Sequence, residues 1–288
     1  MGMVTDATWY DYDLDGLLDL IVVGEWMPIT VFKNRKVGFQ KMTKVTGLTE
    51  SHGLWNTLEV ADINQDGIDD LIVGNLGLNS RFKASPEKPF YLFVNDFDQN
   101  GALDHIYAHY IEDDKLVPFT TKHELTMQLP ELKKKYLLFK DYAGQTMEVL
   151  FGKERLNNSI VLKAETMASK VLLNLGGMFL MNDLPPRSQY SSIHAFLWED
   201  LDDNGIKELV VAGNFSYIKP ELGRYDANFG LLYESSEDQL SLVPNSISGL
   251  KLKGDIKKAA TIRTTQNDKL LVFARNDDTL LFYKMAKD

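Results

Sequence analysis

The chain reads Asp11-Tyr12-Asp13-Leu14-Asp15-Gly16-Leu17-Leu18-Asp19 and continues without a break as Leu20-Ile21-Val22-Val23-Gly24. Oxygen-bearing side chains stand at positions 1, 3, 5 and 9 of the first stretch, and the glycine at position 6 permits a sharp turn. The β-branched apolar run that follows predicts a buried β-strand. An acidic loop leading directly into a strand is therefore the unit from which the fold is inferred.

This loop recurs three more times, at residues 62–70, 96–104 and 200–208, which we number loops 2 to 4 after loop 1 at 11–19. Hard oxygen ligands at this spacing, with the position 7 carbonyl, are typical of Ca²⁺ sites. Position 12 lacks the bidentate glutamate of an EF-hand in every copy. The predicted ligands of up to four Ca²⁺ ions are Asp11, Asp13, Asp15, Leu17 and Asp19; Asp62, Asn64, Asp66, Ile68 and Asp70; Asp96, Asp98, Asn100, Ala102 and Asp104; and Asp200, Asp202, Asn204, Ile206 and Glu208.

Composition narrows the class of protein. The 288 residues have a formal net charge of -10, which argues against nucleic acid as a partner because phosphate backbones need a basic surface. There is no cysteine, so neither a disulfide framework nor a cysteine-ligated zinc site is possible. No apolar run is long enough for a membrane span, and no signal peptide precedes the first strand. We therefore expect this chain to be the C-terminal part of a larger exported protein.

Further repeats predict the architecture. Residues 31–39 and 171–179 both read as strand, Asn/Gly turn and strand, and 270–276 repeats the strand of loop 4 without its acids. Units of about 40 to 50 residues are typical of propeller blades. The sequence predicts a single all-β domain over 1–288, a β-propeller with about five visible blades at 1–50, 51–88, 89–188, 189–248 and 249–288. Apolar residues at helical spacing predict a small helical insertion at about 122–157, with Pro130 starting a second helix.

The repeated loop and strand resemble the FG-GAP or VCBS repeats of integrin-like propellers. More narrowly, the stretches 24–29, 74–81, 140–143 and 220–226 resemble bacterial ASPIC/UnbV-type proteins related to cartilage acidic protein. The resemblance implies Ca²⁺ at the four loops and an extracellular, periplasmic or cell-surface location. Asn100, Asn204 and Glu208 depart from the family pattern, and the two asparagines each remove a charge. We therefore expect loops 3 and 4 to bind calcium more weakly than loops 1 and 2.

Residues just after the repeat strands are expected to gather on one face of a propeller. This face offers aromatic and polar side chains suited to a protein or carbohydrate ligand. The candidate ligand-binding residues are Trp26, Asn79, Arg81, Tyr217, Arg224 and Asp226. The alternative is that Trp26 and Phe215 pack between blades and Arg224 pairs with Asp226. Trp55 and Trp198 are expected in the core.

The function predicted from these features is a calcium-stabilised, non-enzymatic binding or scaffolding module. The histidines show no metal-ligand spacing, and no nucleophile or phosphate-loop motif occurs. One alternative is a carbohydrate-active enzyme domain with a central pocket, for which Glu25, Glu221 and Asp226 are the candidate acids. Another alternative is a purely structural spacer.

Overall fold

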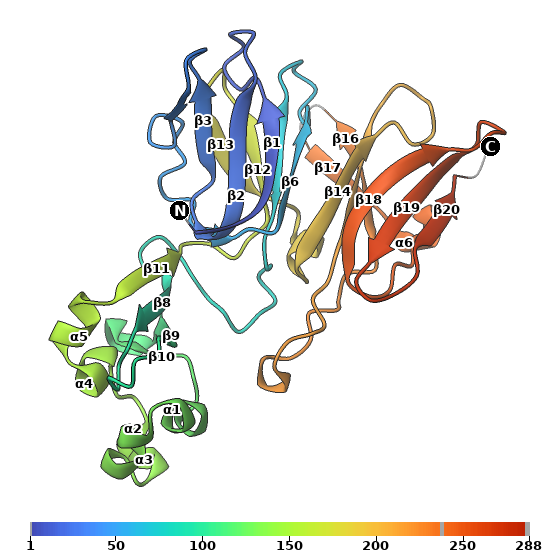
Figure 1. Cartoon of the computed structure of the whole chain (residues 1–288). Helices are drawn as coiled ribbons and strands as arrows, with labels where there is room; N and C mark the ends of the chain where they lie inside the picture. Colours follow the sequence, from blue (N-terminus) through green and yellow to red (C-terminus); the bar gives the residue numbers. More distant parts are fainter. Residues whose placement is uncertain (1, 237–238, 286–288) are drawn as a thin grey trace. The chain divides into compact units, whose positions relative to one another are not determined.

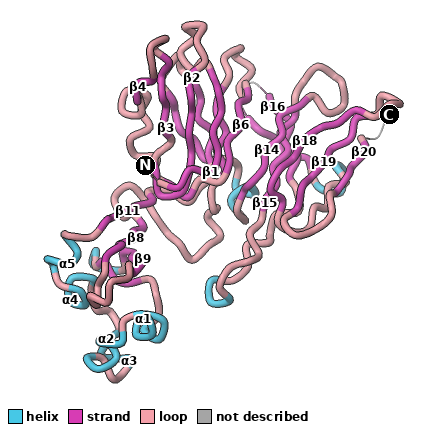
Figure 2. The backbone as a smooth tube through the Cα atoms, viewed as in Figure 1, coloured by secondary structure: helices cyan, strands magenta, loops and turns pink. Residues whose placement is uncertain are grey.

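A computed structural model describes residues 2–236 and 239–285, and its contacts divide the chain into two compact units. The first unit combines Met1–Arg81 with Met167–Asp288, and the second is Phe82–Thr166. The secondary structure is predominantly β, arranged in antiparallel sheets (Figures 1 and 2). The sequence predicted one domain with a short helical insertion, whereas the inserted unit in the structure also contains a sheet of its own.

The first sheet is formed by the N-terminal strands in the order in which they occur. It contains β1 (Met3–Tyr10), β2 (Asp19–Met27), β3 (Thr30–Asn34) and β4 (Phe39–Lys41), and the short β5 (Gly53–Leu54) also pairs with β2. The acidic residue at position 9 of loop 1 is the first residue of β2. The strand and hairpin predicted at 20–24 and 31–39 are thereby confirmed.

The second sheet is interrupted in sequence by the inserted unit. Its order is β13-β12-β7-β6, with β6 (Thr57–Ala61) and β7 (Asp70–Gly74) before the insertion and β12 (Lys170–Asn174) and β13 (Phe179–Asp183) after it. Val73 pairs with Lys170 and Leu71 with Leu172. The predicted 171–179 hairpin is confirmed, but it completes the sheet of loop 2. The expected blade 89–188 is therefore divided between two sheets.

The third and fourth sheets follow the second along the chain. The third contains β14 (Ile193–Glu199), β15 (Glu208–Gly213), β16 (Leu231–Ser236) and β17 (Gln239–Val243), and the fourth contains β18 (Ile256–Arg263), β19 (Lys269–Arg275) and β20 (Leu281–Lys284). The short helices of this unit are η2 (Pro186–Gln189), η3 (Pro220–Leu222) and α6 (Asn245–Ser248). The strand predicted at 270–275 is confirmed as β19.

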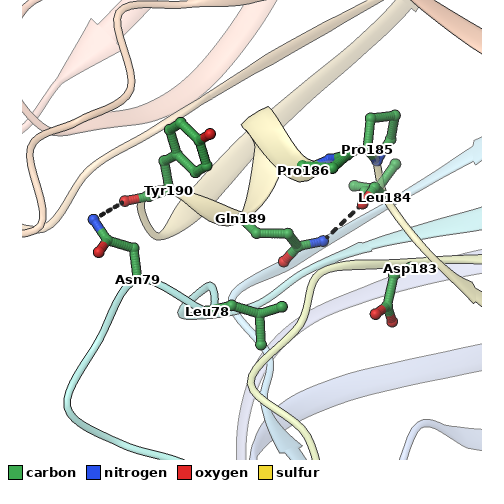
Figure 3. A pocket seen from close by; sticks show the side chains of 8 residues that line it. All are labelled: Leu78, Asn79, Asp183, Leu184, Pro185, Pro186, Gln189 and Tyr190. Carbon is green, nitrogen blue, oxygen red and sulfur yellow. Dashed lines mark hydrogen bonds between the residues drawn. The ribbon is translucent and has the colours of Figure 1, made fainter.

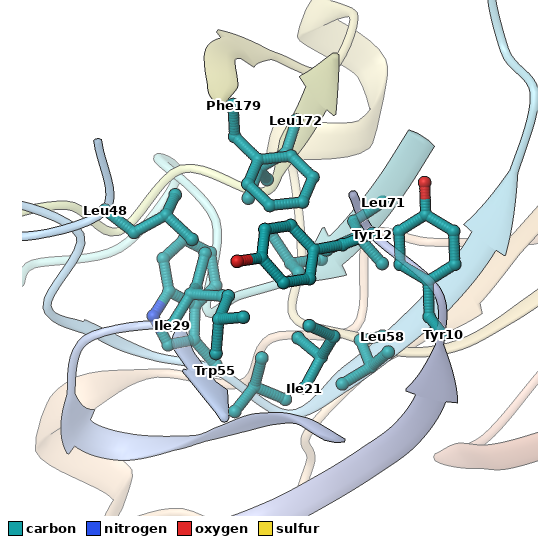
Figure 4. Packing of buried hydrophobic residues seen from close by; sticks show 13 residues of the cluster. Tyr10, Tyr12, Ile21, Ile29, Leu48, Trp55, Leu58, Leu71, Leu172 and Phe179 are labelled. Atoms are coloured by element: carbon teal, nitrogen blue, oxygen red, sulfur yellow. The ribbon is translucent and has the colours of Figure 1, made fainter. Parts of the chain in front are cut away.

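Apolar clusters join these four sheets in sequence order. The first cluster packs the first sheet on the second around Trp55, which is fully buried (Figure 4). A second cluster joins the second and third sheets, with Trp198 partly buried against it, and another joins the third and fourth. The first strands β1, β6, β14 and β18 contact one another consecutively. Because apolar residues line both faces of the middle sheets, stacking is what buries this unit's core.

The inserted unit has its own sheet and core. The sheet has the order β10-β9-β8-β11, with β8 (Phe90–Asn95), β9 (Asp104–Tyr110), β10 (Leu116–Pro118) and β11 (Ile160–Ala164). The short helices are η1 (Glu112–Asp114), α1 (Lys122–Gln128), α2 (Pro130–Lys135), α3 (Phe139–Tyr142), α4 (Met147–Phe151) and α5 (Lys153–Asn157). Thr121 and Glu124 cap α1, and Pro130 begins α2 as predicted. In the described residues no helix is long and apolar enough to cross a membrane.

Candidate calcium loops and ligand face

The four acidic loops share one backbone conformation. Position 4 is left-handed in each, with φ of 57° at Leu14, 58° at Gln65, 59° at Gln99 and 60° at Asp203. The glycine at position 6 has φ between 83° and 90° in all four loops. A side chain is strained at such a φ, so the glycine is required by the turn itself. Identical turns in two compact units show that the nine-residue motif sets its own geometry.

A repeated set of hydrogen bonds stabilises this turn. The acid at position 1 accepts one N–H from position 5 and another from the glycine, as Asp11 does from Asp15 at 3.0 Å and from Gly16 at 2.8 Å. The same pairs form in loops 2, 3 and 4, at 2.9 to 3.1 Å. The side chain at position 5 accepts the N–H of position 7 in every loop. The loops therefore obtain part of their order from their own backbone.

The acid at position 9 connects each loop to its sheet. In loops 2, 3 and 4 it accepts the N–H of position 2, at 3.2, 3.0 and 2.8 Å. Asp19 and Asp70 also accept the N–H of Asn34 and Asn174 at 2.7 Å, and Asp104 accepts the Gln128 side-chain amide at 2.9 Å. Position 9 is thus a buried structural residue as well as a candidate ligand.

Burial has an electrostatic consequence at position 9. It raises the pKa of Asp70 to about 6 and raises those of Asp19 and Glu208 above their ordinary values, because a buried carboxylate loses its hydration. Neighbouring acids of the same loops add to each rise. Oxygen Oδ2 of Asp19 is buried and has no hydrogen-bond partner among the described residues, and the same is true of Asp13 Oδ1. These carboxylates would be stabilised by a cation nearby.

Three of the loops bring acidic oxygens close enough to share an ion. In loops 1, 3 and 4 the groups are Asp11, Asp13 and Asp15; Asp96, Asp98 and Asp104; and Asp200, Asp202 and Glu208, each with oxygens within 4.8 Å of one another. Oxygen-only donor sets of this kind fit a hard cation such as Ca²⁺. Among the described residues the acids of loop 2 form no such group. Asn64 of loop 2 instead donates to Asp66 at 2.8 Å.

The side chains that follow the repeat strands are less open than the sequence suggested. Trp26 is only 8% exposed, so it is not an aromatic platform for a ligand. The packing alternative therefore describes this residue better. Arg224 and Asp226 are both exposed and form an ion pair at 3.7 Å, as the same alternative expected. Tyr217, by contrast, is 68% exposed.

Three of the remaining candidates line two surface pockets of the first unit. Asn79 lines a pocket of about 630 Å³ with Leu78, Pro185 and Tyr190, and its amide donates to the Tyr190 carbonyl at 3.2 Å (Figure 3). Tyr217 and Arg224 line the second pocket. The structure therefore does not gather the six candidates into one ligand site.

The second pocket, of about 520 Å³, contains polar groups that the sequence analysis missed. Besides Tyr217 and Arg224, it is lined by Ser216, Ile218, Pro220, Gly254, Asp255, Asn276, Asp277 and Asp278. Asp255 is buried and accepts the N–H of Ser216 at 2.9 Å and its hydroxyl at 2.6 Å. Asp255 lies just before β18, a loop position that no repeat pattern singled out. Arg81 does not line this pocket but bonds the Glu221 carbonyl at 2.8 Å.

The acids named for an enzyme do not converge in these pockets. Neither pocket is lined by Glu25, Glu221 or Asp226. Glu25 is half-buried, and burial raises its pKa, whereas the other two acids are exposed. The pocket of Tyr217 contains three other carboxylates. Neither of these two pockets is therefore a paired-acid site built from the three predicted residues.

Comparison with known proteins identifies part of the chain. A search of curated proteins gives no significant match. The family model of the FG-GAP-like repeat matches residues 11–73, which contain loops 1 and 2 and the strands from β2 to most of β7. The narrower resemblance to ASPIC/UnbV-type proteins stays a prediction. Residues 11–73 are therefore similar to the FG-GAP-like repeat.

Proposed function

We propose that the chain is a calcium-stabilised, non-enzymatic binding or scaffolding module of an exported or surface protein. The observation that carries this proposal is the convergence of acidic oxygens in loops 1, 3 and 4 on a turn that recurs unchanged. Calcium there offsets repulsion among carboxylates and couples metal binding to folding. Extracellular calcium, at millimolar concentration, is sufficient for weak sites of this class.

The architecture proposed for this module is a β-propeller built from FG-GAP-like blades. The support is the consecutive stacking of four sheets, each with its first strand against the first strand of the next. In such a ring, residues after the second strands lie at the end opposite the calcium loops. The pocket of Tyr217 and Arg224 lies at that end, near Asn276. We propose this end as the surface for a protein or glycan ligand.

Isothermal titration with Ca²⁺ and thermal unfolding with and without chelator test the calcium proposal. Binding with millimolar or tighter affinity and a lower Tm in chelator are expected. Magnesium at the same concentration is the control, because it demands a smaller and more regular oxygen shell. An unchanged Tm in chelator, with no heat of binding, would refute it. Glycan-array and hydrolysis assays on the same sample separate a binding module from an enzyme.

A further inference from the structure

In the sheets of loops 1, 2 and 4, one residue on the strand next to the loop's second strand stands opposite position 9. In the third sheet Glu234 pairs with Glu208. In the first sheet Leu20 pairs with Phe32, and continuing this antiparallel register by one residue places Lys33 opposite Asp19. In the second sheet Leu71 pairs with Leu172, and the same step places Leu173 opposite Asp70. The bonds from Asn34 and Asn174 to these acids confirm that the two sheets correspond. The same structural position therefore carries a cation, an apolar residue and an anion.

Lys33 extends its ammonium group into loop 1. Its Nζ donates to Asp13 and, at 2.9 Å, to Asp15, and it lies 6.0 Å from the centre of the Tyr12 ring. The side chain is only 10% exposed. A lysine ammonium is positively charged at neutral pH, and here it lies within hydrogen-bonding distance of two carboxylates. Positions 3 and 5, which are predicted calcium ligands, are thus already paired with a positive charge.

Loops 2 and 4 have no such group at this position. Leu173 places an apolar side chain there in loop 2. In loop 4 the residue at this position is Glu234, an acid that stands opposite Glu208. Lys269 contacts loop 4 from the fourth sheet, where it donates to the backbone carbonyl of Asp200 and, at 2.7 Å, to the carboxylate of Asp203, which is position 4 and not a predicted ligand. Within the described part of the chain, Lys269 therefore does not bond a predicted ligand carboxylate of loop 4, as Lys33 does in loop 1.

We infer that Lys33 is a built-in cation that excludes calcium from loop 1 and makes loop 1 a metal-independent turn. An ammonium and a Ca²⁺ ion compete for the same oxygens of Asp13 and Asp15, and like charges repel at this distance. Calcium binds there only if Lys33 leaves a largely buried position. This inference rests on the proposed calcium function, and it reverses the order expected from the acid count, which placed loop 1 among the strongest sites.

The test is the number of Ca²⁺ ions bound, measured by isothermal titration of the whole chain and of three variants. Lys33→Leu copies the residue of the second sheet, Lys33→Arg keeps the charge, and Lys41→Leu removes an exposed lysine from the same sheet. Lys33→Leu is expected to bind one more Ca²⁺ than the parent, because the positive charge that competes for Asp13 and Asp15 is removed. The other two variants are expected to match the parent.

Asp15→Ala assigns the additional ion to loop 1, because alanine offers no oxygen at position 5, whereas the asparagine of loops 3 and 4 does. In the Lys33→Leu background Asp15→Ala is expected to remove the additional ion, whereas in the parent it leaves the number of bound ions unchanged. The comparison of the parent with parental Asp15→Ala tests the inference even if Lys33→Leu does not fold. A lower number of bound ions in parental Asp15→Ala, or equal binding by the parent and folded Lys33→Leu, would overturn the inference alone. No calcium binding by any of these proteins would overturn the proposed function as well.

Discussion

Excision of the inserted unit tests whether the first unit folds by itself. The change removes residues 82–166 and joins Arg81 to Met167 with a short Gly/Ser linker. The structure indicates that the ends are close, because Gly77 donates to the Met167 carbonyl at 2.8 Å and Asn75 to the Ser169 hydroxyl at 2.9 Å. The register of β7 with β12 does not involve the excised residues. The four stacked sheets are therefore expected to form without the insertion.

The expected change in stability follows from chain entropy. The excision shortens the connection between Arg81 and Met167 from about 85 residues to about eight, which is roughly three successive halvings of its length. If the insertion were a flexible loop, this shortening would stabilise the folded state by at most about 2 kcal/mol. Since the insertion is folded, the gain is smaller. For a unit of about 200 residues, 1 kcal/mol changes Tm by roughly 2–4 °C. The Tm in calcium is thus expected to stay within about 8 °C of the parental value.

A longer deletion provides the matched control. Removing 82–174 also deletes β12, with the fully buried Leu172 and with Asn174, whose N–H bonds Asp70 at 2.7 Å. Each buried aliphatic side chain contributes about 1.5–3 kcal/mol, and the unpaired buried acid costs a further 1–3 kcal/mol or so. This sum approaches a typical total stability. Circular dichroism and thermal unfolding should show a folded short deletion and an unfolded long one. Loss of structure in both would refute the independence of the first unit.

Three further outcomes are expected. Trp55→Ala should lower the free energy of unfolding by about 3–5 kcal/mol in urea titrations, because the ring is fully buried, and Trp198→Ala should cost clearly less. Burial lowers the pKa of His194 from 6.5 to about 3, so the folded state binds this proton less than the unfolded state does. Stability should therefore be lost as pH falls below about 6.5, by at most about 1.4 kcal/mol per pH unit, and His194→Gln should flatten the profile relative to the parent. Gly67→Ala should cost roughly 1 kcal/mol, since φ is +85° and no atom lies within 4 Å of the added Cβ, so a neutral result would contradict the strain argument.

Local features of this fold could be predicted because they depend on neighbouring residues. The loop turn requires an oxygen-bearing side chain at position 1 and glycine at position 6, and both positions lie within the same nine-residue motif. The buried strands β2, β7 and β15 follow from continuous apolar runs, and the start of α2 follows from Pro130. These signals lie within one element, so no knowledge of tertiary contacts was needed.

Contacts between distant segments could not be predicted in the same way. The pairing of β7 with β12 joins segments about 100 residues apart, and the intervening acidic loop 3 suggested a further blade at that place. The burial of Trp26 could not be predicted because it depends on tertiary packing. An aromatic side chain at this point of the sequence is equally compatible with a ligand-binding surface and with the core. The position of Lys33 requires the register of β2 with β3. Comparing residues 31–34 with 171–174 aligns Lys33 with Leu173, but only the register places this difference against the loop.

Position 9 explains why the loops and the sheets occur together. Asp19, Asp70, Asp104 and Glu208 are each the last acid of a loop and the first residue of a buried strand. In loops 2, 3 and 4 their hydrogen bonds to position 2 hold the loop closed. Bonds to other segments hold Asp19, Asp70 and Asp104 in place. A cation bound at the loop would stabilise the same carboxylates whose burial the fold requires. Under the proposed calcium function, metal binding and sheet assembly are therefore linked through the acid at position 9, whereas at loop 1 Lys33 supplies a positive charge to Asp13 and Asp15 from within the chain.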